Sequence, residues 1–541
     1  MDIIKKIAQE VGCRSNQAEA AVKLIDEGYT IPFIARYRKE ATGSLNDEQL
    51  RLLHERLTYL RNLEDKKSQV IASIDEQGKL TPELKKEIEA AETMVLVDDL
   101  YRPFRPKRKT RATIAQAKGL EGLANIITLQ MPGSDIAKEA EKYISEEKGV
   151  ESTNEAISGA MDIIAENISD TADYRKVIRE LTVKKGTVVT SAKDPEAESV
   201  YEMYYDFSTP VSKMTGYRTL AINRGEKEKF ITVKIEAPVD EIISYLEKKT
   251  ITGNNPEASK ILSDTIADSY VRLIAPAIDR EIRNYLTESA EDGAIKVFAS
   301  NLQQLLMQPP IAGQTVLGWD PAFRTGCKLA VVDPTGKVLD TVVIFPTAPQ
   351  KKVAEAKKIL KALIKKYGIT LISVGNGTAS RESEMVIAEL ISELDTPVQY
   401  VITNEAGASV YSASKLATEE FPNFDVGQRS AASIARRVQD PLAELVKIDP
   451  KAIGVGQYQH DMNQKKLSEA LDAVVEDSVN KVGVDLNTAS APLMEHISGI
   501  NKTLAKNIVD YREANGRFNA RKELLKVAKL GPKAYEQCAG F

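Results

Sequence analysis

The stretch from Val316 to Phe345, VLGWDPAFRTGCKLAVVDPTGKVLDTVVIF, contains three apolar runs separated by short polar turns. Such runs, rich in β-branched residues and bounded by Gly, Pro and Asp, predict strands. The turn Asp333–Gly336 returns the chain into the third run. Downstream, apolar residues at helical spacing alternate with two further short apolar runs. The predicted elements are strands at Val316–Trp319, Lys328–Val332 and Val338–Phe345, a helix at Val353–Tyr367, a strand at Ile369–Val374, a helix at Arg381–Leu394 and a strand at Val398–Thr403.

The order βββαβαβ predicts an RNase H-like layer, in which helices cover a mixed sheet. In that fold the acid at the end of the first strand helps to hold catalytic Mg²⁺, and Asp320 has this position. Glu405 follows the last predicted strand and is expected to face Asp320. Two-metal phosphodiester cleavage needs about three or four carboxylates. Asp425 and Asp440 are candidates for the third, but neither has a spacing that singles it out. The carboxylate set is therefore incomplete, and no catalytic residue is assigned. Asp320, Glu405 and Asp425 are vestigial candidates. The sequence favours a protein without enzymatic activity.

Two other interpretations of this module stay open. Asp320 could cap the loop Ala322–Gly326 by accepting backbone N–H bonds, as strand-end aspartates often do. The small-residue loop Asn376–Ser380 precedes a helix, so its amides could cradle a phosphate.

The chain has 541 residues and a formal charge of −5, which excludes an overall basic protein. The segment Leu486–Phe541 nevertheless has nine Lys/Arg against five Asp/Glu, a balance typical of local contact with an anionic polymer. Cys13, Cys327 and Cys538 form no close pair, so we expect no disulfide, no metal and no other cofactor. No apolar run approaches the length of a membrane span, so we expect a cytoplasmic protein without membrane contact.

The length predicts about three or four domains. We expect an N-terminal helical domain with a helix-turn-helix-like start at 1–200, a central helical domain with a small β element at 201–312, the RNase H-like domain at 313–450 and a tandem helix-hairpin-helix domain at 451–541. The small β element is one isolated strand at Phe230–Glu236. Asp194-Pro195 is expected to start a helix whose Tyr201, Tyr204 and Tyr205 enter the core. The predicted fold class is a multidomain, mainly α-helical scaffold with one inserted α/β domain.

The densest charge run, Tyr101–Arg111, interleaves cations with aromatic residues. This composition suits phosphate neutralisation together with base stacking. The candidate contacts are Arg102, Arg105, Lys107, Arg108 and Arg111. The alternative is a solvated loop whose cations pair with acidic helices such as Glu83–Glu92.

The tail has tandem helix-hairpin-helix spacing, with each hairpin followed by a helix that starts beside a lysine. A hairpin glycine permits close approach of a phosphate, and the following helix directs N–H groups and its positive dipole end at it. Such contacts ignore base identity. The alternative is a pair of helical hairpins that only cap the core. The expected nucleic-acid-binding residues are Gly499, Asn501, Lys502, Gly531 and Lys533.

Several longer motifs resemble the bacterial Tex transcription accessory family: IPFIARYRKEATGSL, LAINRGE, GWDPAFRTGCKLAVVD, VGNGTASRE, NEAGASVYSAS and SIARRVQDPLAELVKIDPKAIGVGQYQHD. The resemblance implies an elongated helical scaffold with a YqgF/RuvC-like domain that generally lacks a working nuclease site, and sequence-tolerant nucleic-acid binding in transcription. Members usually continue into a C-terminal OB-fold RNA-binding domain, which this chain is expected to lack. Ala322, Asn501 and Lys529 stand where the family usually has glycine.

The leading hypothesis is a sequence-tolerant scaffold that binds RNA or DNA as a transcription accessory factor, with RNA polymerase or ribosome-associated machinery as a further partner. One alternative is a structure-selective nuclease that uses Asp320, Glu405 and Mg²⁺ or Mn²⁺. The other is a protein–protein adaptor whose basic surfaces meet acidic partners.

Overall fold

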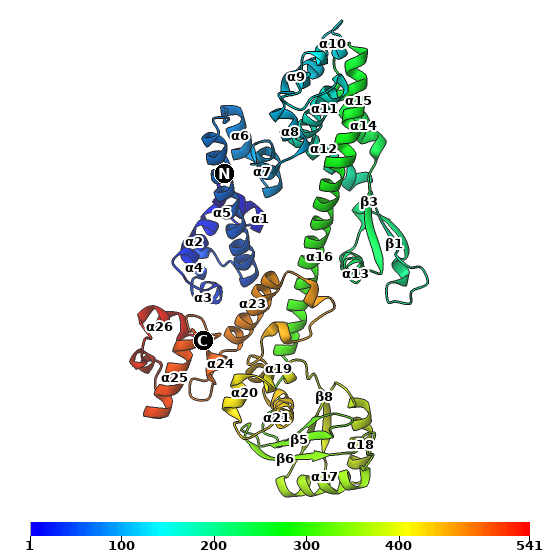
Figure 1. Ribbon diagram of the computed structural model, residues 1–541. Helices are drawn as coiled ribbons and strands as arrows, with labels where there is room; N and C mark the ends of the chain where they lie inside the picture. Colours follow the sequence, from blue (N-terminus) through cyan, green and yellow to red (C-terminus); the bar gives the residue numbers. More distant parts are fainter. Residues whose placement is uncertain (1) are drawn as a thin grey trace. The chain divides into compact units, whose positions relative to one another are not determined.

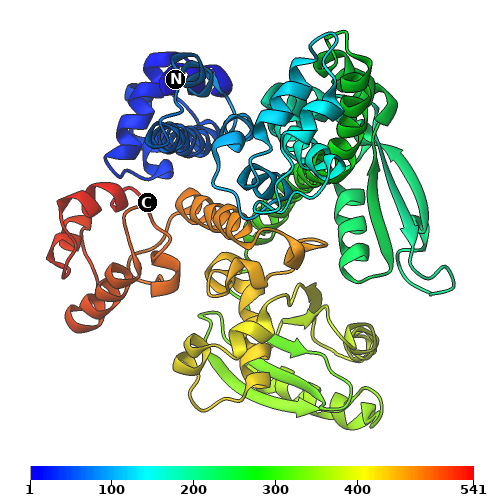
Figure 2. The same ribbon diagram turned by 45° about the horizontal axis from the view of Figure 1, so that its top comes forward.

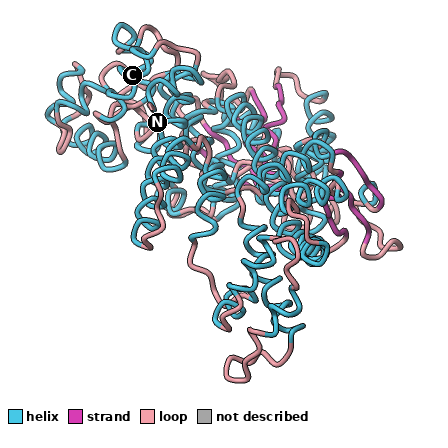
Figure 3. The backbone as a smooth tube through the Cα atoms, turned by 90° about the horizontal axis from the view of Figure 1, so that it is seen from above, coloured by secondary structure: helices cyan, strands magenta, loops and turns pink. Residues whose placement is uncertain are grey.

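The computed structural model describes residues 2–541, which separate into two compact units. Unit 1 comprises the chain up to Ala18 together with Leu52–Gly293, and unit 2 comprises Glu19–Arg51 and Ala294–Phe541. The divisions fall inside three helices: α2 (Ser15–Asp26), α5 (Asp47–Glu76) and α16 (Ala275–Leu306). Figure 1 labels the elements, and Figure 3 shows the strands within a chain that is otherwise mainly helical. The predicted four-domain division stays a prediction.

Unit 1 is mainly helical because aliphatic residues recur three or four positions apart and so share one helix face. In α11, for example, Ala156, Ala160 and Ile163 are buried. The helices are α1 (Ile3–Val11), α6 (Pro82–Ala90), α7 (Met94–Tyr101), α8 (Arg111–Ala117), α9 (Glu121–Leu129), α10 (Ile136–Glu141), α11 (Thr153–Asp170), α12 (Ala172–Lys185), α13 (Gly216–Lys227), α14 (Val239–Thr250), α15 (Pro256–Ser269) and the π-helix Tyr270–Ile274.

Unit 1 also contains a three-stranded antiparallel sheet in the order β2-β1-β3, beside which Figure 2 shows a helix. Its strands are β1 (Thr187–Ala192), β2 (Asp206–Pro210) and β3 (Ile231–Glu236). The strand predicted at Phe230–Glu236 is therefore present as β3, but its predicted isolation is wrong. The helix predicted from Asp194 is also wrong, because the Asp194 carboxylate accepts a hydrogen bond from the N–H of Glu196 at 3.1 Å and makes a turn. Tyr201 and Tyr204 are buried, as predicted, whereas Tyr205 is only half-buried.

Unit 2 contains a five-stranded mixed sheet in the order β6-β5-β4-β7-β8, and its chain order confirms the predicted βββαβαβ arrangement. β4 pairs antiparallel with β5 and parallel with β7. The elements are β4 (Val316–Asp320), β5 (Cys327–Val332), β6 (Val338–Ile344), α17 (Val353–Tyr367), β7 (Leu371–Gly375), α18 (Ser380–Ser392), β8 (Gln399–Thr403), α19 (Ala408–Ser412), α20 (Lys415–Glu420), α21 (Val426–Gln439) and α22 (Pro441–Leu445).

Helices cover both faces of this sheet. On one face, α17 and α18 bury Leu360 and Ile387 against strand residues such as Trp319. On the other face, α21 packs so closely on β4 that a Cβ at Gly318 would lie 2.0 Å from the carbonyl oxygen of Ala431. The absence of a side chain at Gly318 thus permits the contact that sets α21 against the strand ending in Asp320.

The remaining helices of unit 2 belong to the N-terminal segment and the tail. They are α3 (Ile31–Tyr37), α4 (Lys39–Thr42), α23 (Gln464–Val482), α24 (Ala491–Met494), α25 (Lys502–Asn515) and α26 (Pro532–Cys538). The segment before the second hairpin of the tail forms a 3₁₀ helix, Arg521–Lys526, where the tandem helix-hairpin-helix spacing predicted an α-helix. The loop before α3 packs on the tail, since the N–H of Thr30 donates to Gln537 Oε1 at 3.1 Å.

None of the helices within residues 2–541 combines the length and the apolar character that crossing a membrane requires.

Candidate nucleic-acid interface

Asp320 lies at the end of β4, where α21 and β5 partly enclose its carboxylate. Burial raises the pKa of Asp320, while the Ser430 hydroxyl, which donates a hydrogen bond, and the nearby Lys328 act in the opposite direction. A carboxylate in this position is shielded from water but not neutralised by a close ion pair.

The Glu405 carboxylate lies against the glycine loop that follows β7. A Cβ at Gly377 would lie 1.6 Å from Glu405 Oε1, and a Cβ at Gly375 would lie 2.0 Å from Oε2. The backbone of Gly377 hydrogen-bonds the carboxylate, while burial and the charge of Asp320 raise the pKa of Glu405. The predicted phosphate cradle at Asn376–Ser380 therefore holds an internal carboxylate, which lies near enough to Asp320 to feel its charge.

The two candidates for a third carboxylate are both helix caps. Asp425 accepts a hydrogen bond from the N–H of Gln428 at 2.8 Å and starts α21. Asp440 accepts one from the N–H of Ala443 at 3.0 Å and starts α22. Capping satisfies backbone donors at the helix start, which explains an aspartate at both positions without any metal chemistry.

The side chain that α21 places beside Glu405 is a buried cation, Arg437. Its Nη1 donates to the carbonyl oxygens of Asn404 and Ala406, both at 2.8 Å. Burial lowers the pKa of Arg437 to about 10, while Glu444 and Glu405 act in the opposite direction. Sequence reasoning missed Arg437 because a lone arginine in a helix carries no signal of burial.

This donor set does not fit a two-metal centre. Within residues 2–541 no three His, Cys, Asp or Glu side chains are grouped so that they could hold a metal ion. Next to Asp320 and Glu405, α21 contributes the Ser430 hydroxyl and the Arg437 guanidinium, where two-metal chemistry would need further carboxylates.

The first hairpin of the tail is fixed by a buried amide. Asn480 of α23 donates to the carbonyl oxygen of His496 at 2.7 Å and accepts from the N–H of Ser498 at 2.9 Å. Gly499 has φ +78°, and a Cβ there would lie 2.8 Å from Gln537 Cβ. Asn501 then caps α25 by accepting from the N–H of Leu504 at 2.9 Å. The close approach at Gly499 is therefore to α26 of the same chain.

The second hairpin is arranged differently. Lys529 adopts φ +66°, while Gly531 caps α26 from extended backbone and has open space around its Cβ position. The Lys533 ammonium donates to the carbonyl oxygen of Glu27 and lies 5.4 Å from the centre of the Tyr29 ring. Lys533 thus contacts the N-terminal segment of unit 2.

A set of exposed cations on α25 and the segment after it forms no ion pair within residues 2–541. We call this set the tail basic surface, and it consists of Lys502, Lys506, Arg517, Arg521, Lys522, Lys526 and Lys529. The side-chain amide of Asn507 donates to the carbonyl oxygen of Ala528 at 2.8 Å, so α25 lies beside the second hairpin. Most of these residues were not named from the sequence, although the excess of Lys and Arg in the tail was the signal.

Three of the six cations of Tyr101–Arg111 form ion pairs inside unit 1. Arg102 pairs with Asp170 at 3.1 Å, Arg105 pairs with Asp98 at 2.9 Å and Lys107 pairs with Glu166 at 3.2 Å. Arg108 and Arg111 are exposed, and Arg111 acts to lower the pKa values of Asp162 and Asp268. The partners are thus acids of α7, α11 and α15, and a nucleic-acid contact here stays a prediction.

Comparison with known proteins adds family matches along the chain. Residues 1–75 match the Tex-like protein N-terminal domain, residues 131–298 the Tex central region, residues 314–439 the Tex protein YqgF-like domain and residues 479–541 a helix-hairpin-helix motif.

Similar proteins occur in bacteria and in humans. YdcI of Bacillus subtilis is 53% identical over 99% of this chain and 75% of its own length. The transcriptional accessory protein Tex of Neisseria gonorrhoeae is 46% identical over 100% of this chain and 72% of its own length. The S1 RNA-binding domain-containing protein 1 of Homo sapiens is 38% identical, and the match covers 56% of that protein. The chain belongs to the Tex family.

Proposed function

We propose that this protein is a scaffold that binds RNA or DNA without sequence preference and acts as a transcription accessory factor. The proposal rests on the tail basic surface, whose cations are exposed and form no ion pair within residues 2–541. It is supported by the helix-hairpin-helix match over residues 479–541 and by the similarity to the transcriptional accessory protein of Neisseria gonorrhoeae.

The start of α25 supports the proposal in a second way. Asn501 caps only the N–H of Leu504, which leaves the first amides of α25 directed outward beside Lys502. These amides and the helix dipole favour an anion at the same end at which Lys502 and Lys506 present their charges. A phosphate backbone fits this combination, and no base edge is needed for binding.

The hairpin residues have distinct proposed roles. Lys502 and Asn501 contribute to the phosphate contact, while Gly499 packs the hairpin on α26. Gly531 is open to solvent and allows a strand to approach. The Glu27 carbonyl oxygen already occupies one of the three donors of the Lys533 ammonium, so we assign Lys533 a smaller share of the binding.

The experiment is a titration of the full chain with oligo(U) and oligo(dT) at several salt concentrations. For single strands each phosphate contact contributes roughly 0.7 to the slope of log affinity against log salt. We expect Lys502→Glu with Lys506→Glu to reduce affinity at least about tenfold, since two attractive charges become repulsive.

The matched control is Lys415→Glu with Lys465→Glu, which reverses two lysines of unit 2 that are 91% and 86% exposed. Equal losses in both variants would indicate a non-specific charge effect. The proposed phosphate contacts of the tail would be contradicted if the affinity did not depend on salt concentration. They would also be contradicted if the affinity were unchanged in the Lys502/Lys506 variant.

A nuclease dependent on Mg²⁺ or Mn²⁺ is the second candidate, because the charge of Asp320 raises the pKa of Glu405 and a cation would relieve that repulsion. Against it stand the buried Arg437 and the capping roles of Asp425 and Asp440. We expect no cleavage of branched or single-stranded DNA or RNA with either metal. Cleavage that disappears in Asp320→Asn would reverse this ranking.

An adaptor role toward RNA polymerase or ribosome-associated machinery is the third candidate. Pull-down from nuclease-treated extract separates it from nucleic-acid binding, because a protein contact survives the nuclease. We expect recovery of such partners to fall after nuclease treatment.

A further inference from the structure

Helix α17 and the turn before it carry the densest run of lysine in unit 2. Residues 351–366 contain seven lysines and a single acid, Glu355, in a chain whose formal charge is −5. The apolar residues of α17 face the sheet, where Leu360, Leu363 and Ile364 enter the core. The lysines therefore lie on the opposite, solvent-facing side of the helix.

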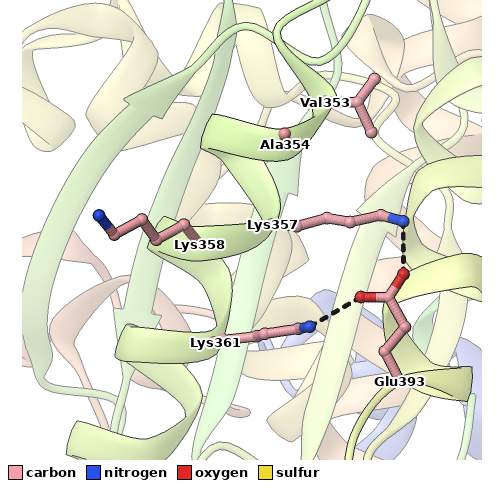
Figure 4. Close-up of a pocket in the computed structure, with 6 residues that line it drawn as sticks. All are labelled: Val353, Ala354, Lys357, Lys358, Lys361 and Glu393. Carbon is pink, nitrogen blue, oxygen red and sulfur yellow. Dashed lines mark hydrogen bonds and ion pairs between the residues drawn. The ribbon is translucent and has the colours of Figure 1, made fainter.

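Some of these lysines are neutralised by neighbouring acids. The pairs are Lys357 with Glu389 and Glu393, Lys361 with Glu393, Lys352 with Glu355 and Lys366 with Asp340. Figure 4 shows Lys357 and Lys361 directed toward Glu393, while Lys358 extends to the other side of the helix.

Among the described residues, three lysines of this run lack an acidic neighbour within ion-pair distance. Lys351, Lys358 and Lys365 are exposed and form no ion pair within residues 2–541. Lys358 and Lys365 are separated by two helical turns and share one side of α17 with the small residues Ala354 and Ala362. Small side chains between the cations leave room for an extended anionic chain along the helix.

A shallow groove of about 620 Å³ borders one of the three, Lys358. It is lined by Val353, Ala354, Lys357, Lys358, Lys361 and Glu393. Each of its three lysines provides up to three donors, and Glu393 is the single acid among the lining residues.

The composition of this surface indicates which partner it fits. Protein interfaces are enriched in aromatic residues, Met and Arg and depleted in Lys. None of the large apolar side chains that are exposed within residues 2–541 comes from α17, and the helix contains no arginine. Lysines bind phosphates as point charges that need no fixed geometry, which suits a backbone of variable conformation.

We propose that Lys351, Lys358 and Lys365, the α17 lysine surface, bind the phosphate backbone of a nucleic-acid strand. This surface lies on the face of the sheet opposite to α21 and Asp320, and it is distinct from the tail basic surface. The inference rests on the proposed nucleic-acid binding. It adds a second contact, through which the RNase H-like layer binds a strand on the face that α17 covers.

The test uses the full chain with Lys358→Gln and Lys365→Gln, titrated with oligo(U) and with oligo(dT). Loss of two phosphate contacts lowers the log–log salt slope by roughly 1.4 and the affinity roughly tenfold near physiological salt. The control is Lys415→Gln with Lys465→Gln, which removes the same charge from highly exposed positions and is expected to leave both quantities unchanged.

A second measurement uses the unmodified protein, so it does not depend on the folding of a variant. Chemical acetylation of Lys358 and Lys365 is expected to fall several-fold when oligo(U) or oligo(dT) is bound, while acetylation of Lys415 stays constant. Protection by one of the two oligonucleotides alone identifies RNA or DNA as the source of the phosphates.

Three outcomes overturn the inference. The α17 contact is refuted, while the proposed function stands, if the protein binds oligonucleotides but two results are negative. These are an unchanged log–log salt slope in the Lys358/Lys365 variant and an unchanged acetylation of Lys358 and Lys365 on binding. Protection by polyglutamate and not by oligonucleotides would assign α17 to an acidic protein. Failure of the unmodified chain to bind either oligonucleotide would refute both proposals together.

Discussion

Charged side chains around β4 and those of the tail differ in what surrounds them. Near β4, Asp320 and Glu405 are partly enclosed, burial raises the pKa of both, and the positive charge of Arg437 acts on Glu405 from within the fold. In the tail, Lys502 and Lys506 are exposed and have no ion pair within residues 2–541. A carboxyl group whose pKa is raised by burial binds its proton more tightly, whereas an exposed charge that forms no ion pair attracts a charged ligand over a Debye length. Availability of charge, and not the presence of charged residues, separates a candidate binding surface from an internal network.

The largest expected effect is on the buried network. Arg437→Met leaves the carbonyl oxygens of Asn404 and Ala406 without their buried donor, at a cost of about 1–3 kcal/mol each, and it removes a positive charge that acts on Glu405. Urea unfolding measures the loss. Adding Glu405→Gln to the same variant is expected to recover the part that is due to charge, and no recovery would mean that Arg437 acts through its hydrogen bonds and packing alone.

The next largest effects are expected at the two hairpin glycines. Gly499 is enclosed by α26 whereas Gly531 is open, just as the carboxylates near β4 are enclosed and the tail lysines are exposed. Gly499 has φ +78° and no room for a Cβ, so Gly499→Ala is expected to cost about 2 kcal/mol. Gly531 has φ −87° and open space, so Gly531→Ala is expected to leave the unfolding free energy unchanged. Thermal unfolding of both variants is the measurement. A larger loss for Gly531→Ala would contradict the assigned roles.

A smaller, pH-dependent effect is expected at Asp320. Its pKa is raised by burial, so the folded state binds the proton more tightly than the unfolded state, and stability is lost as pH rises through the folded-state pKa. Asp320→Asn removes this loss. The variant is therefore expected to be more stable than the parent near neutral pH, with the difference vanishing below about pH 4, where the unfolded carboxyl is protonated. An unfolding series across this range would contradict the assignment if the difference were constant.

The smallest effect is expected at the basic run of unit 1. Arg105 forms an exposed pair with Asp98, and such pairs contribute about 0–1 kcal/mol. Arg105→Gln is expected to leave both the unfolding free energy and oligonucleotide affinity nearly unchanged. Arg108→Gln, at an exposed position, is the comparison. A clear loss of oligonucleotide affinity in either variant would show that the run Tyr101–Arg111 contributes to nucleic-acid binding.

Local pattern was sufficient to predict the five-stranded sheet, because each strand is a short run rich in apolar residues that ends at or near Asp, Asn, Gly or Pro. It was not sufficient for the three-stranded sheet. β2 is a short strand of mostly exposed residues that pairs with a strand from before Asp194, and such pairing leaves no periodic signal in either segment. The helix predicted from Asp194 failed for a related reason, since an Asp-Pro pair starts turns as well as helices.

By itself the sequence determined the family motifs, the βββαβαβ order and the positive tail, all of which depend on residues close together in the chain. Only the tertiary structure decided which charges are free. It paired Arg102, Arg105 and Lys107 with acids of other segments and buried Arg437 beside Glu405. It also left Lys358 and Lys365 in solvent. The physical reason is that Coulomb interactions and burial depend on distance in space, which the spacing of residues along a chain does not fix.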